Sequence, residues 1–259
     1  MNTPVEGFSK LSKTEKIDWI AKHCTKDPVA SKKLLELYWI EDPKVQKVHD
    51  EFIENTLSNY YLPFAVAPNF LLNGAFYAIP MVIEESSVVA AASNAAKFWL
   101  NRGGFKSQII GTEKVGQVHF MFHGNTDKLP SFFAQLKPKL ISSVSTITKN
   151  MEKRGGGIND IELRSLDDKL KGYHQLHCTF ETLDAMGANF INSCLEQFAK
   201  TLKSEAKTYS PFTPEEAALE VVMSILSNYV PQCLVKAAVS CPVSDLGQAG
   251  ISGLEFAKK

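Results

Sequence analysis

The N-terminal part of the chain has the apolar spacing of amphipathic helices with clear start signals. Ser12-Lys-Thr-Glu15 is a capping box, and apolar side chains follow it at helical spacing. Asp-Pro pairs at 27–28 and 42–43 each place a capping side chain before a first-turn proline. The pattern therefore predicts three short helices, the last of which ends before Leu62-Pro63.

The next stretch combines a hairpin signal with a helix signal. Asn73-Gly74 stands between two apolar runs, which is typical of a tight β-hairpin turn, and Ile79–Ile83 is a short apolar strand. Ser86 or Ser87 is placed to cap a helix that runs through the following alanines. Gly103-Gly104 ends that helix.

Beyond residue 105 the pattern alternates between strands and helices. The expected elements, in order, are a strand at 115–122, a helix at 128–153, strands at 158–165 and 172–182, a helix at 189–205 and an apolar strand at 219–226. Pro138 is expected to interrupt the first of these helices. The order β-α-β-β-α-β is the split βαβ or ferredoxin-like arrangement. The sequence therefore predicts an α+β fold.

Composition and charge narrow the classes of function. At 259 residues the chain is long enough for one large domain or two small ones. Its 28 lysines and arginines balance 28 aspartates and glutamates, so no basic surface for nucleic acid is expected. No apolar run approaches the ~20 residues of a membrane span, and the charged N-terminus does not resemble a signal peptide. We therefore expect a cytoplasmic protein with neither a nucleic-acid nor a membrane partner.

The cysteines and histidines do not form a metal-binding pattern. Five cysteines is an odd number and no Cys-x-x-Cys occurs, so neither a disulfide framework nor a zinc ribbon is predicted. On a strand, His174 and Cys178 would share one face while His177 points to the other. Three ligands cannot converge from such a strand, so we expect no metal.

Two acidic residues, Glu84 and Glu85, lie between the apolar strand and the helix start. A carboxyl at a strand end, surrounded by apolar side chains, can stay protonated and act as a proton donor. The alternative is a pair of solvated carboxylates in a loop. Ser87, at the helix N-terminus, also has two interpretations: it helps to hold an anion, or it is an ordinary N-cap.

A strand-to-helix connection carries a second candidate site. Its residues, most of them small, are Asp184, Ala185, Met186, Gly187, Ala188 and Asn189. Small residues allow a ligand to approach the backbone, and the N-terminus of the following helix favours phosphate. The spacing is not that of the G-x-G-x-x-G dinucleotide motif. The alternative is a plain turn, and Gly155–Gly157 allows the same two interpretations.

Several blocks of the sequence resemble one enzyme family. LPFAVAPNFLLNG, IPMVIEESSVVAAAS, GGF, GGGINDIEL and DAMGANFIN occur in that order between residues 62 and 192. Together they resemble 3-hydroxy-3-methylglutaryl-CoA (HMG-CoA) reductase of the bacterial, class II type. Ser86 departs from the proline that usually follows the two acids, and Ser58 departs from a usual glycine.

The resemblance implies an oxidoreductase that reduces HMG-CoA to mevalonate and CoA with NADPH or NADH, in isoprenoid metabolism. It implies a larger CoA-substrate domain at 1–109 and 230–259, and an inserted ferredoxin-like dinucleotide domain at 110–229. By resemblance, Glu85 is the catalytic proton donor, Ser87 contacts the substrate and residues 184–189 bind the cofactor. Because the family is dimeric, a homodimer or a higher homo-oligomer is expected of the complete protein.

Other catalytic blocks of the family are missing from these residues. The family's lysine lies in an HNKGI-like block, its aspartate in a block shortly after and its histidine near the end, and none of these blocks occurs here. We therefore expect a C-terminally truncated reductase that is inactive alone. The alternative is a catalytically inactive paralogue that binds the dinucleotide or CoA. The choice between NADH and NADPH stays open; the residue at the position of a ribose-binding acid in NADH users, seven positions before the triple glycine, is Thr148.

Overall fold

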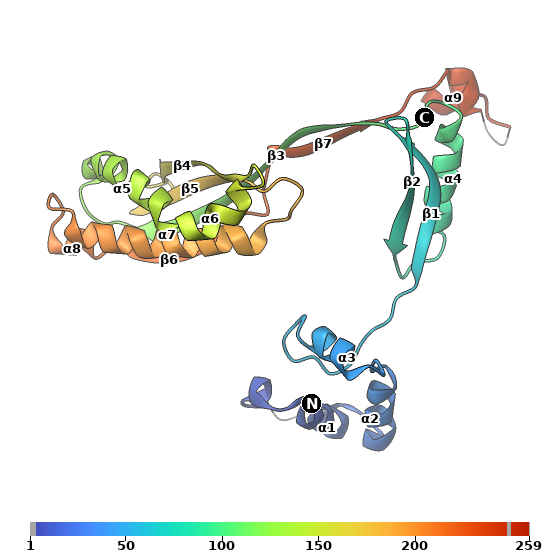
Figure 1. The fold of residues 1–259 in the computed structure, drawn as a ribbon, viewed down its shortest axis with the longest axis horizontal. Helices are drawn as coiled ribbons and strands as arrows, with labels where there is room; N and C mark the ends of the chain where they lie inside the picture. Colours follow the sequence, from blue (N-terminus) through green and yellow to red (C-terminus); the bar gives the residue numbers. More distant parts are fainter. Residues whose placement is uncertain (1–3, 248–249, 259) are drawn as a thin grey trace. The chain divides into compact units, whose positions relative to one another are not determined.

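The computed structural model describes residues 4–247 and 250–258, which form two compact units (Figure 1). The first unit contains the described residues up to 104 and from 241 onward, and the second contains residues 105–240. The sequence analysis places the boundaries at 109/110 and 229/230. Those domain boundaries stay a prediction; in the structure strand β3 begins at Lys106 and its pairing partner β7 ends at Ala238.

Three helices open the first unit, as the sequence predicts. After a short 3₁₀ turn, η1 (Phe8–Lys10), they are α1 (Lys13–Cys24), α2 (Pro28–Leu37) and α3 (Pro43–Asp50). Ser12, Asp27 and Asp42 cap them with their side chains. The predicted capping box forms, because the Ser12 amide donates to Glu15 Oε2 at 2.7 Å and the Glu15 amide donates to Ser12 Oγ at 3.3 Å.

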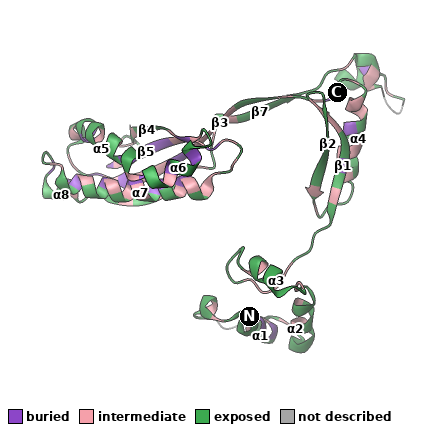
Figure 2. Cartoon of the chain, viewed as in Figure 1, coloured by how far each residue is buried: buried purple, intermediate pink, exposed green. Residues whose placement is uncertain are grey.

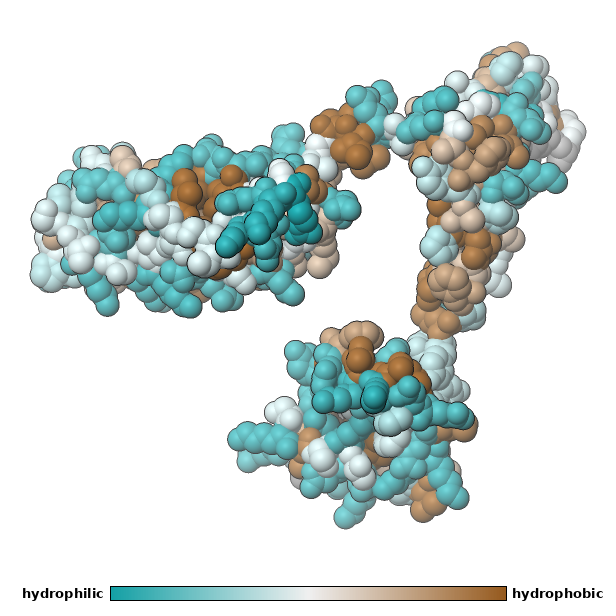
Figure 3. All heavy atoms as spheres, in the orientation of Figure 1, coloured by the Kyte–Doolittle hydropathy of each residue, from teal (hydrophilic) through white to brown (hydrophobic). Residues whose placement is uncertain are grey.

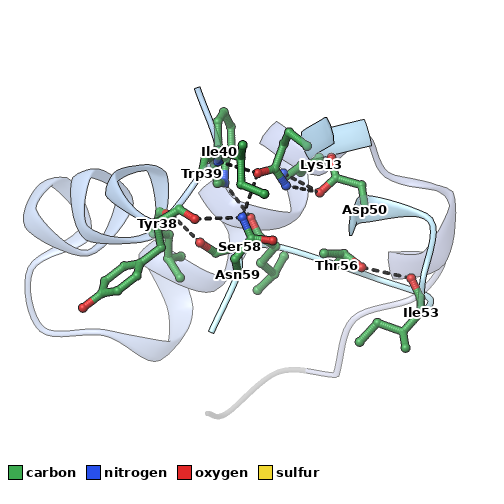
Figure 4. Close-up of polar contacts among 12 residues, drawn as sticks. Lys13, Tyr38, Trp39, Ile40, Asp50, Ile53, Thr56, Ser58 and Asn59 are labelled. Carbon is green, nitrogen blue, oxygen red and sulfur yellow. Dashed lines mark hydrogen bonds and ion pairs between the residues drawn. The ribbon is translucent and has the colours of Figure 1, made fainter. Parts of the chain in front are cut away.

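A polar network joins α1, α3 and the chain that follows them (Figure 4). Lys13 Nζ pairs with Asp50 Oδ1 at 2.7 Å, and the Gln46 amide group donates to the same oxygen at 2.7 Å. The Asn59 amide donates to Gln46 Oε1 at 2.7 Å and to the Tyr38 carbonyl at 2.8 Å. Gln46 is buried at the centre of this network. Side-chain hydrogen bonds therefore supplement a small apolar core in these helices.

The predicted hairpin is confirmed. Strand β1 (Phe64–Leu72) pairs antiparallel with β2 (Ala75–Val82), and Asn73 and Gly74 at the turn both have positive φ, as a tight two-residue hairpin requires. Helix α4 (Val88–Leu100) packs on β1, where Ala67 and Ala96 are fully buried. The unit ends with η3 (Val243–Leu246) and α9 (Gly253–Lys258).

The hairpin exposes many apolar side chains, which form what we call the apolar hairpin surface. Its residues are Phe64, Val66, Phe76 and Val82, which share one face of the hairpin. Figure 3 shows apolar atoms gathered over this part of the chain. Soluble monomers rarely expose large contiguous apolar patches, so such a surface is typical of a region that packs against further protein.

The second unit is built on an antiparallel sheet. Its strands are β3 (Lys106–Met121), β4 (Gly157–Ser165), β5 (Tyr173–Glu181), β6 (Glu220–Leu226) and β7 (Cys233–Ala238). Four of them lie in the order β4-β5-β3-β6, while β7 pairs with the first part of β3. Its helices are η2 (Thr126–Lys128), α5 (Leu129–Ser143), α6 (Ser145–Glu152), α7 (Ala188–Thr208) and α8 (Pro214–Ala217). The predicted order β-α-β-β-α-β is confirmed.

The core of this unit lies between one face of the sheet and its long helices (Figure 2). It contains the fully buried side chains Val118, Phe120, Leu136, Leu140, Ile161, Leu176, Phe180, Leu195, Phe198 and Leu202. Because successive residues of a strand point to opposite faces, the alternate residues of β3, β4 and β5 lie on the other face of the sheet. That face carries polar side chains.

The predicted interruption at Pro138 is wrong. Pro138 lies inside α5, and the break between α5 and α6 comes at Val144. Proline leaves the carbonyl four residues earlier without a helical donor, but Ala134 and Pro138 are both exposed, so water can reach that carbonyl. Val144 is fully buried with non-helical backbone, which turns the chain between the two helices.

Candidate functional site

The loop between β2 and α4 carries the first candidate site. The Glu84 and Glu85 side chains are exposed, and no hydrogen bond or ion pair from residues 4–247 or 250–258 reaches the Glu85 carboxylate. The described residues therefore do not enclose Glu85 in the apolar surroundings that a protonated carboxyl needs. Its role as proton donor stays a prediction.

Ser87 occupies the position before α4 but does not act as an ordinary side-chain cap. An N-cap serine normally has extended backbone and accepts a hydrogen bond from the first helical turn. Ser87 instead has φ of 74°, and among the described residues no side chain caps α4. Its exposed hydroxyl remains free to meet a ligand, while the contact with substrate stays a prediction.

The loop between β5 and α7 carries the second candidate site. Thr182 closes it locally, because its hydroxyl donates to the Ala185 carbonyl at 2.8 Å and its own carbonyl accepts from the Ala185 amide at 3.0 Å. Asp184, Met186 and Asn189 are exposed. The loop thus holds a defined turn and presents its polar side chains and one apolar side chain to solvent.

Gly187 is the residue directly before α7, and no larger residue fits there without strain. Its φ is 75°, and a Cβ at this position would lie 2.5 Å from the Thr182 Cγ2 methyl. In the part of the chain that the structure describes, no side chain caps α7, and its first turn carries no acidic residue. The amide groups at the start of a 21-residue helix therefore stay available, which suits a bound phosphate.

The triple glycine meets the second candidate site at Glu181, the last residue of β5. A Cβ on Gly156 would lie 2.5 Å from the Glu181 carbonyl oxygen, so only glycine allows this approach. Gly155 and Gly157 have φ of 93° and 133°, which glycine adopts most readily. The structure therefore brings together the two glycine-bearing segments that the sequence indicates separately.

Glu181 is a residue of this site that the sequence analysis does not identify. Its Oε1 accepts from the Leu183 amide at 2.6 Å, and its Oε2 accepts from the Thr112 hydroxyl at 2.6 Å. The Thr112 hydrogen bond is the main reason why the pKa of Glu181 lies below its ordinary value. Thr112 comes 69 residues earlier, and only the strand register places the two together, so no local pattern indicates the contact.

The structure confirms the expected orientation of the histidines on β5. His174 is fully buried beside Phe120 on the core side, whereas His177 lies on the polar face of the sheet. Burial lowers the pKa of both imidazoles, so they are neutral over a wider pH range than free histidine. Within the described ranges, no group of three or more histidine, cysteine, aspartate or glutamate side chains is arranged to hold a metal ion.

The polar face of the sheet also contains a cleft of about 470 Å³. Glu113, Glu162, Arg164, His177 and Tyr229 are among the residues that line it. Most of the charged groups there already have partners: Arg164 pairs with Glu162 at 2.9 Å, and Asn159 donates to Glu113 at 2.9 Å. The cleft is separate from the loop at Gly187.

Comparison with known proteins decides the family. The family model described as hydroxymethylglutaryl-coenzyme A reductase matches residues 13–259, which is nearly the whole chain. The chain belongs to the hydroxymethylglutaryl-coenzyme A reductase family. The resemblance seen in its sequence blocks is therefore confirmed.

Individual relatives agree with this assignment. The 3-hydroxy-3-methylglutaryl-coenzyme A reductase of Archaeoglobus fulgidus is 32% identical over 246 residues, which cover 92% of this chain and 51% of that protein. A probable reductase of Borreliella burgdorferi is 30% identical over 210 residues, covering 80% of this chain and 44% of that protein. The chain thus spans about half the length of these curated relatives.

Solved structures give the same result. One match is the class II reductase of Streptococcus pneumoniae bound to NADPH in open conformations. The alignment covers 99% of this chain and 65% of that chain, with a TM-score of 0.70 and 28% sequence identity. The α+β fold expected from the sequence is that of this relative. No helix in the described residues is long and apolar enough to cross a membrane.

Proposed function

We propose that this chain contributes the dinucleotide-binding loop and the catalytic acid of an HMG-CoA reductase. The full reaction takes HMG-CoA, two molecules of reduced nicotinamide cofactor and two protons to mevalonate, CoA and two molecules of oxidised cofactor. The cofactor is NADPH or NADH, and it supplies the hydrides when bound. Membership of the reductase family supports the proposal.

The start of α7 is the single observation that carries the cofactor assignment. Gly187 and Ala188 leave its first amide groups open, and a cofactor phosphate is the group that such a helix start holds well. A Cβ on Gly187 would meet the Thr182 methyl group, and the Thr182 hydroxyl donates to the Ala185 carbonyl, so local contacts support a defined turn in this loop. We assign cofactor binding to Asp184 through Asn189, and the bound NADPH of the pneumococcal relative supports a nicotinamide cofactor.

On the substrate side we assign proton donation to Glu85 and a substrate contact to Ser87. Reduction of a carbonyl places negative charge on its oxygen, and an acid at this position delivers the proton as the hydride arrives. Glu85 is exposed in the described residues, so we expect bound substrate to bury it and keep it protonated. Ser87, two residues further along the same loop, is placed to meet the same ligand.

The domain roles follow the same assignment. We propose that residues 1–109 and 230–259 belong to the CoA-substrate domain and that 110–229 form the cofactor domain. The apolar hairpin surface supports assembly with further protein, so we propose a homodimer or a higher homo-oligomer for the active enzyme. We also propose that it works in the cytoplasm, on small-molecule substrates, without nucleic acid or membrane partners.

The test measures binding and turnover separately. NADPH and NADH are titrated into the 259-residue chain and followed by nicotinamide fluorescence, and oxidation with HMG-CoA is followed at 340 nm. We expect binding of at least one reduced cofactor and no turnover, because the family's lysine and histidine blocks are not among these residues. Failure to bind either cofactor would contradict the cofactor assignment. Turnover near ~10 s⁻¹, ordinary for an enzyme, would contradict the proposed inactivity of this chain alone.

One observation favours a second candidate function. Glu85 is exposed and lacks a partner among the described residues, as expected of a protein that binds the dinucleotide or CoA without catalysis. The two candidates differ when the chain is extended to the length of its relatives. Such an extended protein turns over HMG-CoA under the first proposal and only binds ligand under the second.

A further inference from the structure

The β5–α7 loop depends on one carboxylate outside the Asp184–Asn189 segment. Glu181 uses both of its carboxylate oxygens: one accepts from the Leu183 amide and the other from the Thr112 hydroxyl, each at 2.6 Å. Thr112 lies on β3 and Leu183 lies in the loop. Glu181 therefore fastens the beginning of the loop to the neighbouring strand.

Leu183 needs such a contact because its backbone is strained. Its φ is 56°, in the left-handed region that branched and bulky residues rarely adopt. This conformation directs the Leu183 amide to the Glu181 carboxylate and turns the chain toward Gly187. Non-glycine residues keep such a backbone only where surrounding contacts enforce it. The Glu181 hydrogen bond is a contact of this kind.

The surroundings also keep Glu181 charged. Thr112 donates to it, and the Lys114 ammonium lies within electrostatic reach, and both lower the pKa of the Glu181 carboxyl. Gly156 packs on the Glu181 backbone, so both the triple glycine and the β5–α7 loop contact Glu181. Hydrogen bonds to a charged acceptor are stronger than those between neutral groups.

We propose that Glu181 is a positioning residue for the nicotinamide cofactor: it holds Leu183 in left-handed backbone and thereby fixes the loop that presents the start of α7. It does not touch the cofactor itself. The inference rests on the proposed function, because it concerns how the same loop binds its ligand.

The test uses the full 259-residue chain and NADPH as the probe, followed by nicotinamide fluorescence. Glu181→Ala is expected to raise the Kd for NADPH by at least about tenfold, because the ordering of the loop that this charged hydrogen bond supplies in the free chain must then be supplied on binding. Glu181→Gln keeps an oxygen that accepts from the Leu183 amide and offers an NH2 group that donates to the Thr112 hydroxyl oxygen, so it is expected to bind within about threefold of the unchanged chain. Glu162→Ala is the matched control, because Glu162 is an exposed strand carboxylate whose partner is Arg164.

A second variant separates positioning from simple loss of stability. Glycine adopts left-handed backbone at no steric cost, so adding Leu183→Gly to Glu181→Ala is expected to recover much of the lost affinity. Hydrogen exchange in the free chain supplies an independent readout: Glu181→Ala should speed exchange at the Leu183 amide while leaving the core amides of β5 unchanged.

The outcomes are distinguishable. Unchanged affinity in Glu181→Ala, in a chain that itself binds NADPH, overturns the role of Glu181 and leaves the proposed function standing. The role is also overturned if neither Glu181→Gln nor the added Leu183→Gly restores the affinity and if hydrogen exchange is faster throughout β5. Glu181 is then only a structural residue. If the unchanged chain binds neither NADPH nor NADH, the proposed function fails and this inference fails with it.

Discussion

Gly187 and Ser87 both have left-handed backbone conformation, and each is the residue directly before a helix. Each directly precedes the first helical turn, with φ of 75° at Gly187 and 74° at Ser87. No side chain of the described residues caps either helix. Left-handed backbone costs a residue with a side chain roughly 1–2 kcal/mol, so Ser87 holds strain that Gly187 avoids. Both candidate sites are thus helix starts with open amide groups, suited to the anionic ligands proposed for them.

Gly187→Ala should destabilise the chain and weaken NADPH binding together. The new methyl group would lie 2.5 Å from the Thr182 Cγ2 atom and would also force alanine into left-handed backbone. We expect a loss of about 2–4 kcal/mol in the free energy of unfolding, from strain and overpacking combined. Gly155→Ala is the control, because Gly155 has similar φ but nothing within 4 Å of the added methyl, and it should cost only about 1–2 kcal/mol. Equal effects in urea unfolding would contradict the tight packing at Thr182.

Pro138→Ala should stabilise the protein. Alanine restores the amide that α5 lacks at this position and has the best helix propensity, so we expect a gain of about 1–3 kcal/mol in urea unfolding. Pro130→Ala is the matched control, because Pro130 lies in the first turn of α5, where no helical donor is lost. If Pro130→Ala raised the free energy of unfolding as much as Pro138→Ala, the stabilisation would not come from restoring a hydrogen bond inside the helix.

How much of this fold the sequence predicts depends on whether the signal is local. Ser12, Asp27 and Asp42 cap helices in their own segments, and Asn73-Gly74 fixes its own turn, so these elements are predicted correctly. Strand β3 is longer than expected because its first part is stabilised by β7, more than a hundred residues away. The same distinction holds for the candidate site. Residues 184–189 form a block that can be recognised in the sequence, whereas the Glu181–Thr112 contact depends on the strand register.

Glu216 should contribute to the pH dependence of stability. It accepts from Lys128 Nζ at 2.6 Å and from the Thr213 and Asn125 amides at 2.9 Å, and the Lys128 contact is the main cause that lowers its pKa to about 2. Because the pKa of Glu216 in the folded chain lies below its ordinary value of 4.5, this stabilisation is present above pH 4.5 and is lost as the pH falls toward 2.

The check compares Glu216→Gln with the unchanged chain in urea unfolding between pH 6 and pH 2. The variant should be less stable near pH 6, and the difference should shrink as the pH falls. Glu196→Gln, which changes an exposed carboxylate of α7, should follow the unchanged chain at every pH. A Glu216→Gln difference that stays constant over this range would show that Glu216 does not act through its charge.

Glu85→Gln should lower turnover in a protein extended to the length of the curated relatives. Glutamine keeps the shape of the side chain but cannot transfer the proton, and general acid catalysis contributes about 10²–10⁴-fold, so kcat should fall by that order while KM changes little. Glu84→Gln is the control, because Glu84 is an equally exposed carboxylate directly beside Glu85 in the same loop. Greater damage from Glu84→Gln would transfer the assignment to Glu84.

The isolated 259-residue chain should self-associate at micromolar concentration. Phe64 and Phe76 of the apolar hairpin surface are 71% and 68% exposed, and burying such side chains is favourable. Replacing both with lysine should reduce the mass measured by light scattering, whereas replacing the exposed Lys22 and Lys33 with serine should not. A stable monomer before any substitution would contradict this expectation.

The β3–β7 ladder brings the two ends of the second unit together. Lys106 pairs with Ala238, so the polypeptide enters and leaves the second unit at adjacent points. A segment with neighbouring ends can be spliced into a host chain, or removed from it, without stretching the flanking backbone. Under the domain roles proposed above, exchanging residues 106–238 between two reductases at these junctions is expected to exchange their nucleotide preference as well.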